Sequence, residues 1–221
     1  MGPADVAVTL VNLELNSSCN LRCCWCALDH AKPRRIMTRQ ILAKADLTHP
    51  AFARLRSLDL HNGGETLLHP ELLAMLETVA ASKANVPSGA VVGLLTNAML
   101  LSPKMGQRII ASRAVDQLRF SLDGGTPALY EAIRRGAKWP VVRRNVEAFC
   151  AANEAAGHPM STEAICLVEP GGPPGGFDPQ FMELLARLDK VSPRHPHNWD
   201  GSRDLGVDDT SSRELARDRK G

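Results

Sequence analysis

The sequence predicts an α/β fold built on a parallel sheet or a partial barrel. Three observations support this: short apolar runs alternate with helical segments, polar motifs follow several of these runs, and 44% of the 221 residues are hydrophobic. That share is enough for a sizeable buried core. The 26 basic and 24 acidic residues leave a net charge of only +2, so charge favours neither nucleic acid nor an anionic membrane as a partner.

Five apolar runs have the length and composition of strands. They cover residues 8–15, 57–61, 91–96, 117–122 and 163–168, and a sixth short strand is expected over 190–195. Because helical segments separate the runs, we expect parallel pairing with right-handed crossovers.

The helical segments show apolar spacing of three and four residues. The first covers 70–82, and Pro70 stands where a first-turn proline is expected. Ser102 before Pro103 is typical of a cap followed by a first turn, and predicts a helix that reaches Arg113. Three more helices are expected over 127–134, 140–155 and 179–190, the last after a Pro/Gly-rich loop over 169–179.

The length predicts one substantial domain, residues 1–199, followed by a charged, flexible tail over 200–221. From Arg194 onward the last 28 residues hold six basic and six acidic residues and little that packs. No apolar run approaches the roughly 20 residues that span a bilayer. The N-terminus lacks the pattern of a signal peptide. We therefore expect a cytoplasmic protein without a membrane segment.

Four of the six cysteines fall within eight residues: Cys19, Cys23, Cys24 and Cys26. Neighbours this close make poor disulfides, and a reducing cytoplasm keeps thiols available for metals. Three thiolates from one tight loop can bind three corners of a 4Fe–4S cube and leave the fourth iron open to a non-protein ligand. Cys24 is a poor fourth ligand, since its side chain should point away from that of Cys23. The spacing predicts a metal site made by Cys19, Cys23 and Cys26.

The spacing C-x3-C-x-aromatic-C, on a loop after the first strand, resembles the signature of the radical S-adenosylmethionine (radical SAM) superfamily. Trp25 is the aromatic residue, and its ring can shield a cluster from water. The resemblance implies a partial barrel of six β/α units, open on one side for substrate. It also implies two cofactors, a 4Fe–4S cluster and SAM. The alternatives for the cysteines are a zinc site completed by His30, and ordinary reduced thiols.

The stretch 61–66 ends the second strand and resembles the family's Gly-Gly-Glu-Pro motif, with Thr66 in place of proline. Two glycines let the backbone approach a ligand closely, and a carboxylate beside them can accept hydrogen bonds from an ammonium group. The resemblance implies that Gly63, Gly64 and Glu65 hold the methionine amino group of SAM. A plain turn between strand and helix is the alternative.

Polar motifs also follow the third and fourth strands. They resemble the family's Thr-Asn-Gly element, with Ala98 for the glycine, and its Ser-Leu-Asp-Gly element, whose hydroxyl and carboxylate approach SAM. On the next helix, Glu131 and the pair Arg134-Arg135 match a Glu…Arg pattern in which an arginine pairs with the SAM carboxylate. The further SAM-binding candidates are therefore Thr96, Asn97, Ser121, Asp123 and Arg134. Ligands of parallel α/β folds gather at the carboxyl ends of strands, where all these motifs stand.

The resemblance runs from about Val8 to about Trp199 and implies a radical SAM enzyme. In this chemistry a flavodoxin- or ferredoxin-type donor delivers an electron, SAM is cleaved reductively, and a 5′-deoxyadenosyl radical abstracts hydrogen from substrate. No side chain is predicted to be catalytic, because the cofactors carry the chemistry. Cys150 and Cys166 are expected to be small buried hydrophobes.

The stretch 195–201 resembles the end of the barrel in SPASM/twitch-type members, and a loop anchored by one buried Trp is the equal alternative. In those members an auxiliary cluster domain with its own cysteines follows, whereas no cysteine follows Cys166 here. By this resemblance the substrate is a peptide or a carbohydrate-like small molecule. The alternatives are a non-catalytic or truncated relative that binds a cluster or SAM, and, less favoured, a zinc-binding interaction module.

Overall fold

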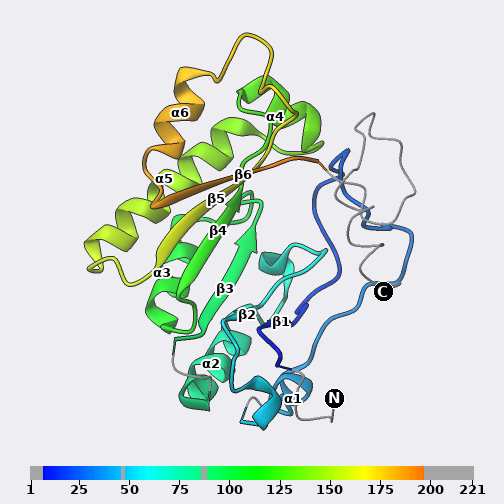
Figure 1. Cartoon of the computed structure of the whole chain (residues 1–221), viewed down its shortest axis with the longest axis vertical. Helices are drawn as coiled ribbons and strands as arrows, with labels where there is room; N and C mark the ends of the chain where they lie inside the picture. The colour runs from blue at the N-terminus through cyan, green and yellow to red at the C-terminus, as the bar shows by residue number, and fades with distance from the viewer. Residues whose placement is uncertain (1–6, 46–47, 86–88, 197–221) are drawn as a thin grey trace.

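A computed structural model describes residues 7–45, 48–85 and 89–196 of the chain. Its strands form one parallel sheet in which each strand pairs with its neighbours in sequence. The strands are β1 (Leu10–Asn12), β2 (Ser57–Asp59), β3 (Val91–Thr96), β4 (Gln117–Ser121), β5 (Ser161–Leu167) and β6 (Lys190–Arg194). β1 and β6 are the two edges, so the sheet is open (Figure 1). The predicted α/β fold with a partial barrel is confirmed.

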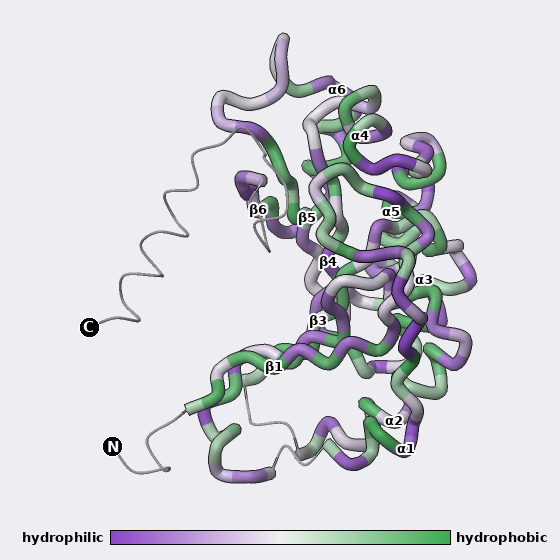
Figure 2. Tube along the Cα trace, turned by 90° about the vertical axis from the view of Figure 1, so that its right-hand side faces the viewer, coloured by the Kyte–Doolittle hydropathy of each residue, from purple (hydrophilic) through white to green (hydrophobic). Residues whose placement is uncertain are grey.

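The helices cover one face of this sheet, as Figure 2 shows for α2 to α6. They are α1 (Arg39–Leu42), α2 (Leu72–Ser82), α3 (Pro103–Ser112), α4 (Pro127–Ile133), α5 (Trp139–Ala155) and α6 (Pro179–Leu185). Short 3-10 turns η2 (Pro50–Phe52), η3 (Thr66–Leu68) and η4 (Lys83–Asn85) occur between them. None of the helices in the described ranges is long and apolar enough to cross a membrane.

The core lies between the sheet and these helices and consists mostly of aliphatic side chains, with a few aromatic contacts among them. Phe120 of β4 meets Phe149 of α5 edge-on, with ring centroids 5.8 Å apart. The ring of Trp139 stacks on that of Phe181 with centroids 4.8 Å apart. The ring of Tyr130 packs edge-on against Trp139 with a centroid distance of 5.4 Å. Such pairs stabilise beyond their buried area, and this chain of rings ties α4, α5 and α6 together.

Several predicted boundaries need correction. β1 pairs over three residues where a run over 8–15 was expected, and α6 ends at Leu185 instead of near 190. The chain leaves α6 early because Asp189 accepts hydrogen bonds from both the backbone and the hydroxyl of Thr162, which aligns β6 beside β5. Pro70 precedes α2 instead of lying in its first turn. The tail over 200–221 and most of the stretch 195–201 lie outside the described residues.

The sheet face opposite the helices carries a ladder of charges. Arg119 of β4 crosses β3 above Gly93 and reaches Asp59 of β2, with Nη2 to Oδ1 at 2.9 Å. Its Nε lies 3.8 Å from a carboxylate oxygen of Glu163 on β5, and the Nζ of Lys190 on β6 lies 2.9 Å from the other. Register partners in parallel strands share a face, so the ladder links β2, across β3, with β4, β5 and β6.

Replacing Gly93 by alanine is expected to break the Arg119–Asp59 bridge. A Cβ there would stand 2.6 Å from Nη2 of Arg119 and 2.6 Å from Oδ1 of Asp59. We expect the free energy of unfolding to fall by about 2 kcal/mol, because both partners are largely buried. In an Arg119→Met background the same substitution should cost clearly less. Urea denaturation of the four proteins measures this, and equal costs in both backgrounds would refute the bridge as the cause.

Candidate metal and cofactor site

The cysteine loop, residues 16–28, is joined on one side to the Gly-Gly-Glu turn. The N–H of Glu65 donates to the carbonyl of Ser18 at 2.8 Å, and Nδ2 of Asn16 donates to the carbonyl of Glu65 at 3.0 Å. A Cβ on Gly64 would lie only 1.9 Å from the carbonyl oxygen of Asn16. The close approach that requires this glycine is therefore the loop's own backbone.

On its other side the loop is joined to β3 and to the segment after α4. The N–H groups of Arg22 and Cys24 each donate, at 2.9 Å, to the carbonyls of Arg135 and Ile133. Nδ2 of Asn97, at the end of β3, donates to Oδ1 of Asn20 at 2.9 Å. The loop is thus fixed to the ends of β2, β3 and α4, although it has no regular secondary structure of its own.

Each of the three predicted ligand sulfurs faces N–H donors. Cys19 Sγ accepts from the Leu21 N–H at 3.4 Å, Cys26 Sγ from the Leu28 N–H at 3.4 Å, and Cys23 Sγ from Nη1 of Arg134 at 3.9 Å. Nδ2 of Asn97 adds a second contact to Cys19 Sγ at 3.9 Å. None of the cysteines is in a disulfide. N–H groups directed at sulfur stabilise a thiolate and tune the iron it binds, so this donor set suits a cluster.

Burial opposes ionisation of these thiols. It raises the pKa of Cys19, and it raises the pKa of Cys23 to about 11, where the charge of Arg134 works against it. The other two thiols contribute to the shift at Cys23, so the three sulfurs are near enough to interact. A bound metal deprotonates a coordinating thiol outright. Without a metal the thiols of Cys19 and Cys23 are therefore held protonated, and a cationic metal group would displace their protons on binding.

A cavity of about 350 Å³ opens beside the loop. Cys23, Cys24 and Cys26 line it together with Arg22, Leu28, His30 and Arg135, whereas Cys19 is half-buried beside Asn97. In the described ranges, no three His, Cys, Asp or Glu side chains surround a point that would hold a single metal ion. The cavity therefore borders two of the three predicted ligands, together with Cys24, and Cys19 does not line it.

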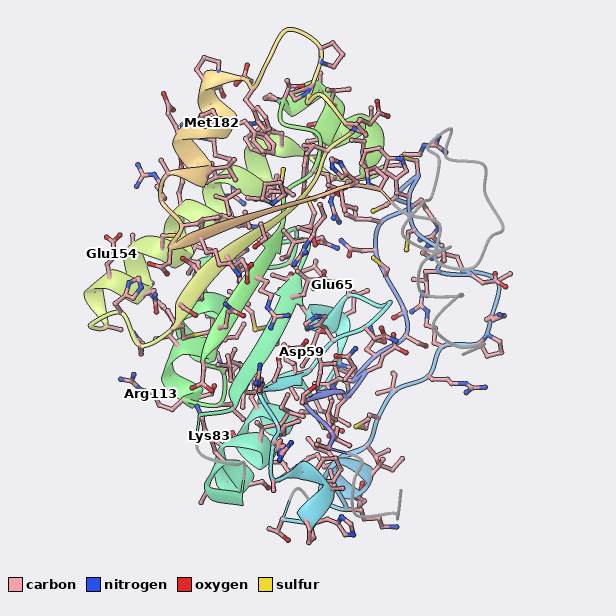
Figure 3. The ribbon with its side chains drawn as sticks, in the orientation of Figure 1. Asp59, Glu65, Lys83, Arg113, Glu154 and Met182 are labelled. Atoms are coloured by element: carbon pink, nitrogen blue, oxygen red, sulfur yellow. The ribbon has the colours of Figure 1, made fainter. Side chains whose placement is uncertain are left out.

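Glu65 is buried, with 3% of its surface exposed, and lies at the carboxyl end of the sheet (Figure 3). Its Oε1 accepts from the Thr96 hydroxyl at 2.8 Å and the Leu67 N–H at 3.1 Å, and its Oε2 accepts from the Asn97 N–H at 2.8 Å. Burial raises the pKa of this carboxyl, and the three donors counteract the rise. Glu65, Thr96 and Asn97 therefore lie together, as expected, but Thr96 and Asn97 donate their hydrogen bonds to the Glu65 carboxylate itself.

The carboxylate of Glu14, which the sequence pattern did not single out, also belongs to this edge. Its Oε1 accepts the N–H groups of Gly63 at 2.9 Å and of Gly64 at 3.1 Å. A charged residue within the apolar run 8–15 is typical of a solvent-facing strand position, so the sequence pattern does not mark Glu14 as a site residue. Glu14 brings a negative charge to the Gly-Gly-Glu turn.

The candidates from β4 and the segment after α4 also meet at this edge. Nη2 of Arg134 pairs with Oδ2 of Asp123 at 2.7 Å, and Oδ1 of Asp123 accepts the Leu167 N–H at 2.8 Å. Asp123 and Ser121 are buried. The predicted site residues of four successive strand ends are thus brought together, with Asp123 and Arg134 paired to each other.

His61, at the end of β2, should make the fold sensitive to acid. Burial and the nearby charge of Arg119 lower the pKa of His61 from 6.5 to about 4, against the opposing effect of Asp59. Between these pH values the unfolded chain binds a proton that the folded chain does not, so stability falls as the pH drops. At pH 4.5 this loss should be about 2 kcal/mol. Urea denaturation at pH 7 and 4.5 should show a smaller loss for His61→Gln, and equal losses would count against this explanation.

Comparison with known families decides the identity of the fold and its cofactors. A model of the Radical SAM superfamily matches residues 13–162. The chain belongs to the radical SAM superfamily. The matched range contains every predicted cofactor-binding and metal-binding residue. The radical SAM cofactors are a 4Fe–4S cluster and SAM, so the predicted cofactors and membership of an enzyme family are confirmed.

Curated relatives include radical SAM proteins of two kinds. The GTP 3′,8-cyclase of Picosynechococcus sp. is 26% identical over 194 residues, which cover 84% of this chain and 53% of that protein. The mycofactocin maturase MftC of Mycobacterium ulcerans is 26% identical over 147 residues, covering 64% and 36%. The chain thus spans about half or less of the length of these relatives.

Solved structures support the fold. Streptococcus suis SuiB bound to SAM superposes with a TM-score of 0.67 at 14% identity, over 97% of this chain and 47% of that one. The protein anSMEcpe with bound SAM gives a TM-score of 0.63 at 17% identity, over 86% and 52%.

Proposed function

We propose that this chain is the core of a radical SAM enzyme in which Cys19, Cys23 and Cys26 hold a 4Fe–4S cluster. The observation that carries the proposal is the cysteine loop itself: three free thiols with N–H donors at their sulfurs, fixed against the Gly-Gly-Glu turn. A cluster with one open iron supplies one-electron reduction of SAM, which yields a 5′-deoxyadenosyl radical for hydrogen abstraction.

The protein's own contribution is to position SAM and to exclude water from the site. Because internal donors occupy the Glu65 carboxylate, we assign Glu65 the task of fixing the ends of β2 and β3 beside each other. The backbone of Gly63 and Gly64 and the carboxylate of Glu14 then offer the polar surface for the cationic methionine end of SAM. Thr96, Asn97, Ser121 and Asp123 frame the remainder of the SAM site, and Arg134 borders it.

For the substrate we favour a peptide over a carbohydrate-like small molecule. The structural neighbour SuiB has been solved bound to its precursor peptide SuiA, and MftC is named a maturase, whereas the cyclases are named for GTP. We also propose the domain limits expected from the sequence, 1–199 and 200–221. A cytoplasmic location is proposed as well. None of the six cysteines forms a disulfide, which supports a reducing compartment.

The electron donor is proposed to be an acidic protein of the flavodoxin or ferredoxin type. Exposed basic side chains surround the cysteine loop: Arg22, Lys32, Arg34, Arg35 and Arg135. In the same stretch the acidic Asp29 pairs only loosely with Lys32, at 3.9 Å. A positive rim beside the redox centre steers a negatively charged partner toward it.

The decisive experiment is to reconstitute the full chain anaerobically with iron and sulfide, reduce it with dithionite and add SAM. We expect cluster-dependent release of 5′-deoxyadenosine. A chain that binds the cluster and SAM but releases none would be a non-catalytic relative. A chain that takes up zinc and no sulfide would be a zinc module.

A further inference from the structure

Arg134 is held inside the protein at the point where α4 ends. α4 finishes at Ile133, and Gly136, with a φ of 97°, turns the chain away two residues after Arg134. The Arg134 side chain points inward with only 13% of its surface exposed, next to an Asp123 side chain that is 2% exposed. A charged arginine side chain that is buried to this extent needs polar partners, because burial removes its hydration.

Two of its three nitrogens have such partners. Nη2 lies 2.7 Å from Oδ2 of Asp123, and Nη1 lies 3.9 Å from Sγ of Cys23. Asp123 is itself anchored, since its other oxygen accepts the Leu167 N–H at 2.8 Å. Nε is buried and lacks a partner among the described atoms. The guanidinium is therefore fixed in place by the protein alone, before any ligand arrives.

The charged and titratable groups that act on Arg134 are few. Asp123 comes from the end of β4, Tyr130 from α4, Glu65 from the Gly-Gly-Glu turn and Cys166 from β5, and the cysteine loop contributes both Cys19 and Cys23. Only Asp123 forms a direct ion pair with it. Because Asp123 holds Nη2, the other terminal nitrogen, Nη1, is directed at the sulfur of Cys23, a predicted ligand.

We propose that Arg134 is a positioning residue for the cluster: held by Asp123, it donates to the sulfur of Cys23 and sets the electrostatic potential there. This inference rests on the proposed function, because it needs the cluster at Cys19, Cys23 and Cys26. A fixed positive charge stabilises a thiolate and favours the reduced, more negative state of the metal group. Arg134 thus acts on the cluster, and its pairing with the SAM carboxylate stays a separate prediction from the sequence.

The test is a redox titration of the reconstituted full chain without SAM, followed by the EPR signal of the reduced cluster. Arg134→Gln should lower the equilibrium constant for one-electron reduction at least about tenfold, a shift of about 59 mV to more negative potential. Arg134→Lys keeps the charge and should retain most of the wild-type potential. Asp123→Asn removes the opposing charge and should shift the potential the other way.

Arg119→Gln is the matched control, because it removes another largely buried arginine whose contacts are Asp59, Gln117 and Glu163. It should leave the potential unchanged. An unchanged potential in Arg134→Gln, with weaker binding of SAM, would overturn the inference and make the arginine a SAM ligand. If Arg134→Gln does not fold, Asp123→Asn decides: a shift to more positive potential supports the inference, and an unchanged potential overturns it. A wild-type chain that takes up no iron and sulfide would instead refute the proposed function.

Discussion

Replacing Gly64 by alanine should destabilise the protein by about 3 kcal/mol and separate the cysteine loop from the Gly-Gly-Glu turn. The added Cβ would lie 1.9 Å from the carbonyl oxygen of Asn16 and 2.9 Å from its carbonyl carbon. Both are backbone atoms, so no rotamer change relieves the clash. The hydrogen bonds that Ser18 and Asn16 form with Glu65 would be lost with the separation.

Gly63→Ala is the matched control, one residue earlier in the same turn. A Cβ there meets Oε1 of Glu14 at 3.5 Å, an ordinary contact, and we expect a loss below about 1 kcal/mol. Urea denaturation gives both values, and iron content after reconstitution reports whether the loop still forms its site. Equal stabilities of the two variants would show that the loops do not meet as described.

Removal of any one of Cys19, Cys23 and Cys26 should abolish stable cluster binding. All three come from a single loop, and a cube already left with one open iron cannot lose a second protein ligand and stay bound. We expect Cys→Ala variants at these positions to lose the visible absorbance of the cluster. The bound iron and acid-labile sulfide should fall at least about tenfold.

Cys24→Ala and Cys166→Ala are the controls. Cys24 lies in the same loop and lines the same cavity, and Cys166 is buried in β5, but neither is a predicted ligand. Both variants should retain iron and sulfide at the wild-type level. A full complement of iron and sulfide in the triple Cys19/Cys23/Cys26→Ala variant would refute the assignment of the site.

The strands were predictable because buried parallel strands are short apolar runs, and β3 occupies the predicted residues 91–96. The ends of elements were harder, since they depend on contacts distant in sequence. Asp189 reaches across to Thr162 and so begins β6 where the helical pattern seemed to continue. α1 has only four residues, too few to show a helical period, and was not predicted.

The sequence predicts which residues form the site, and the structure places these residues close together, but their mutual pairing was not predictable. Spacing suggested the cysteines, the turn after the second strand suggested Glu65, and the resemblance to a Glu…Arg pattern on the next helix suggested Arg134. Sequence does not reveal that the carboxylate of Glu65 faces inward to Thr96, or that Arg134 faces Cys23, because these contacts depend on how neighbouring strands align. Cys150 and Cys166 are buried as small hydrophobes, as predicted.

The central claim is that three cysteines hold a cluster with one iron left for SAM. It is tested most directly by EPR spectra of the dithionite-reduced, reconstituted chain recorded with and without SAM. We expect the cluster signal to change on addition of SAM and to be absent from the Cys23→Ala variant. A cluster signal that is identical in the presence and absence of saturating SAM would contradict the claim.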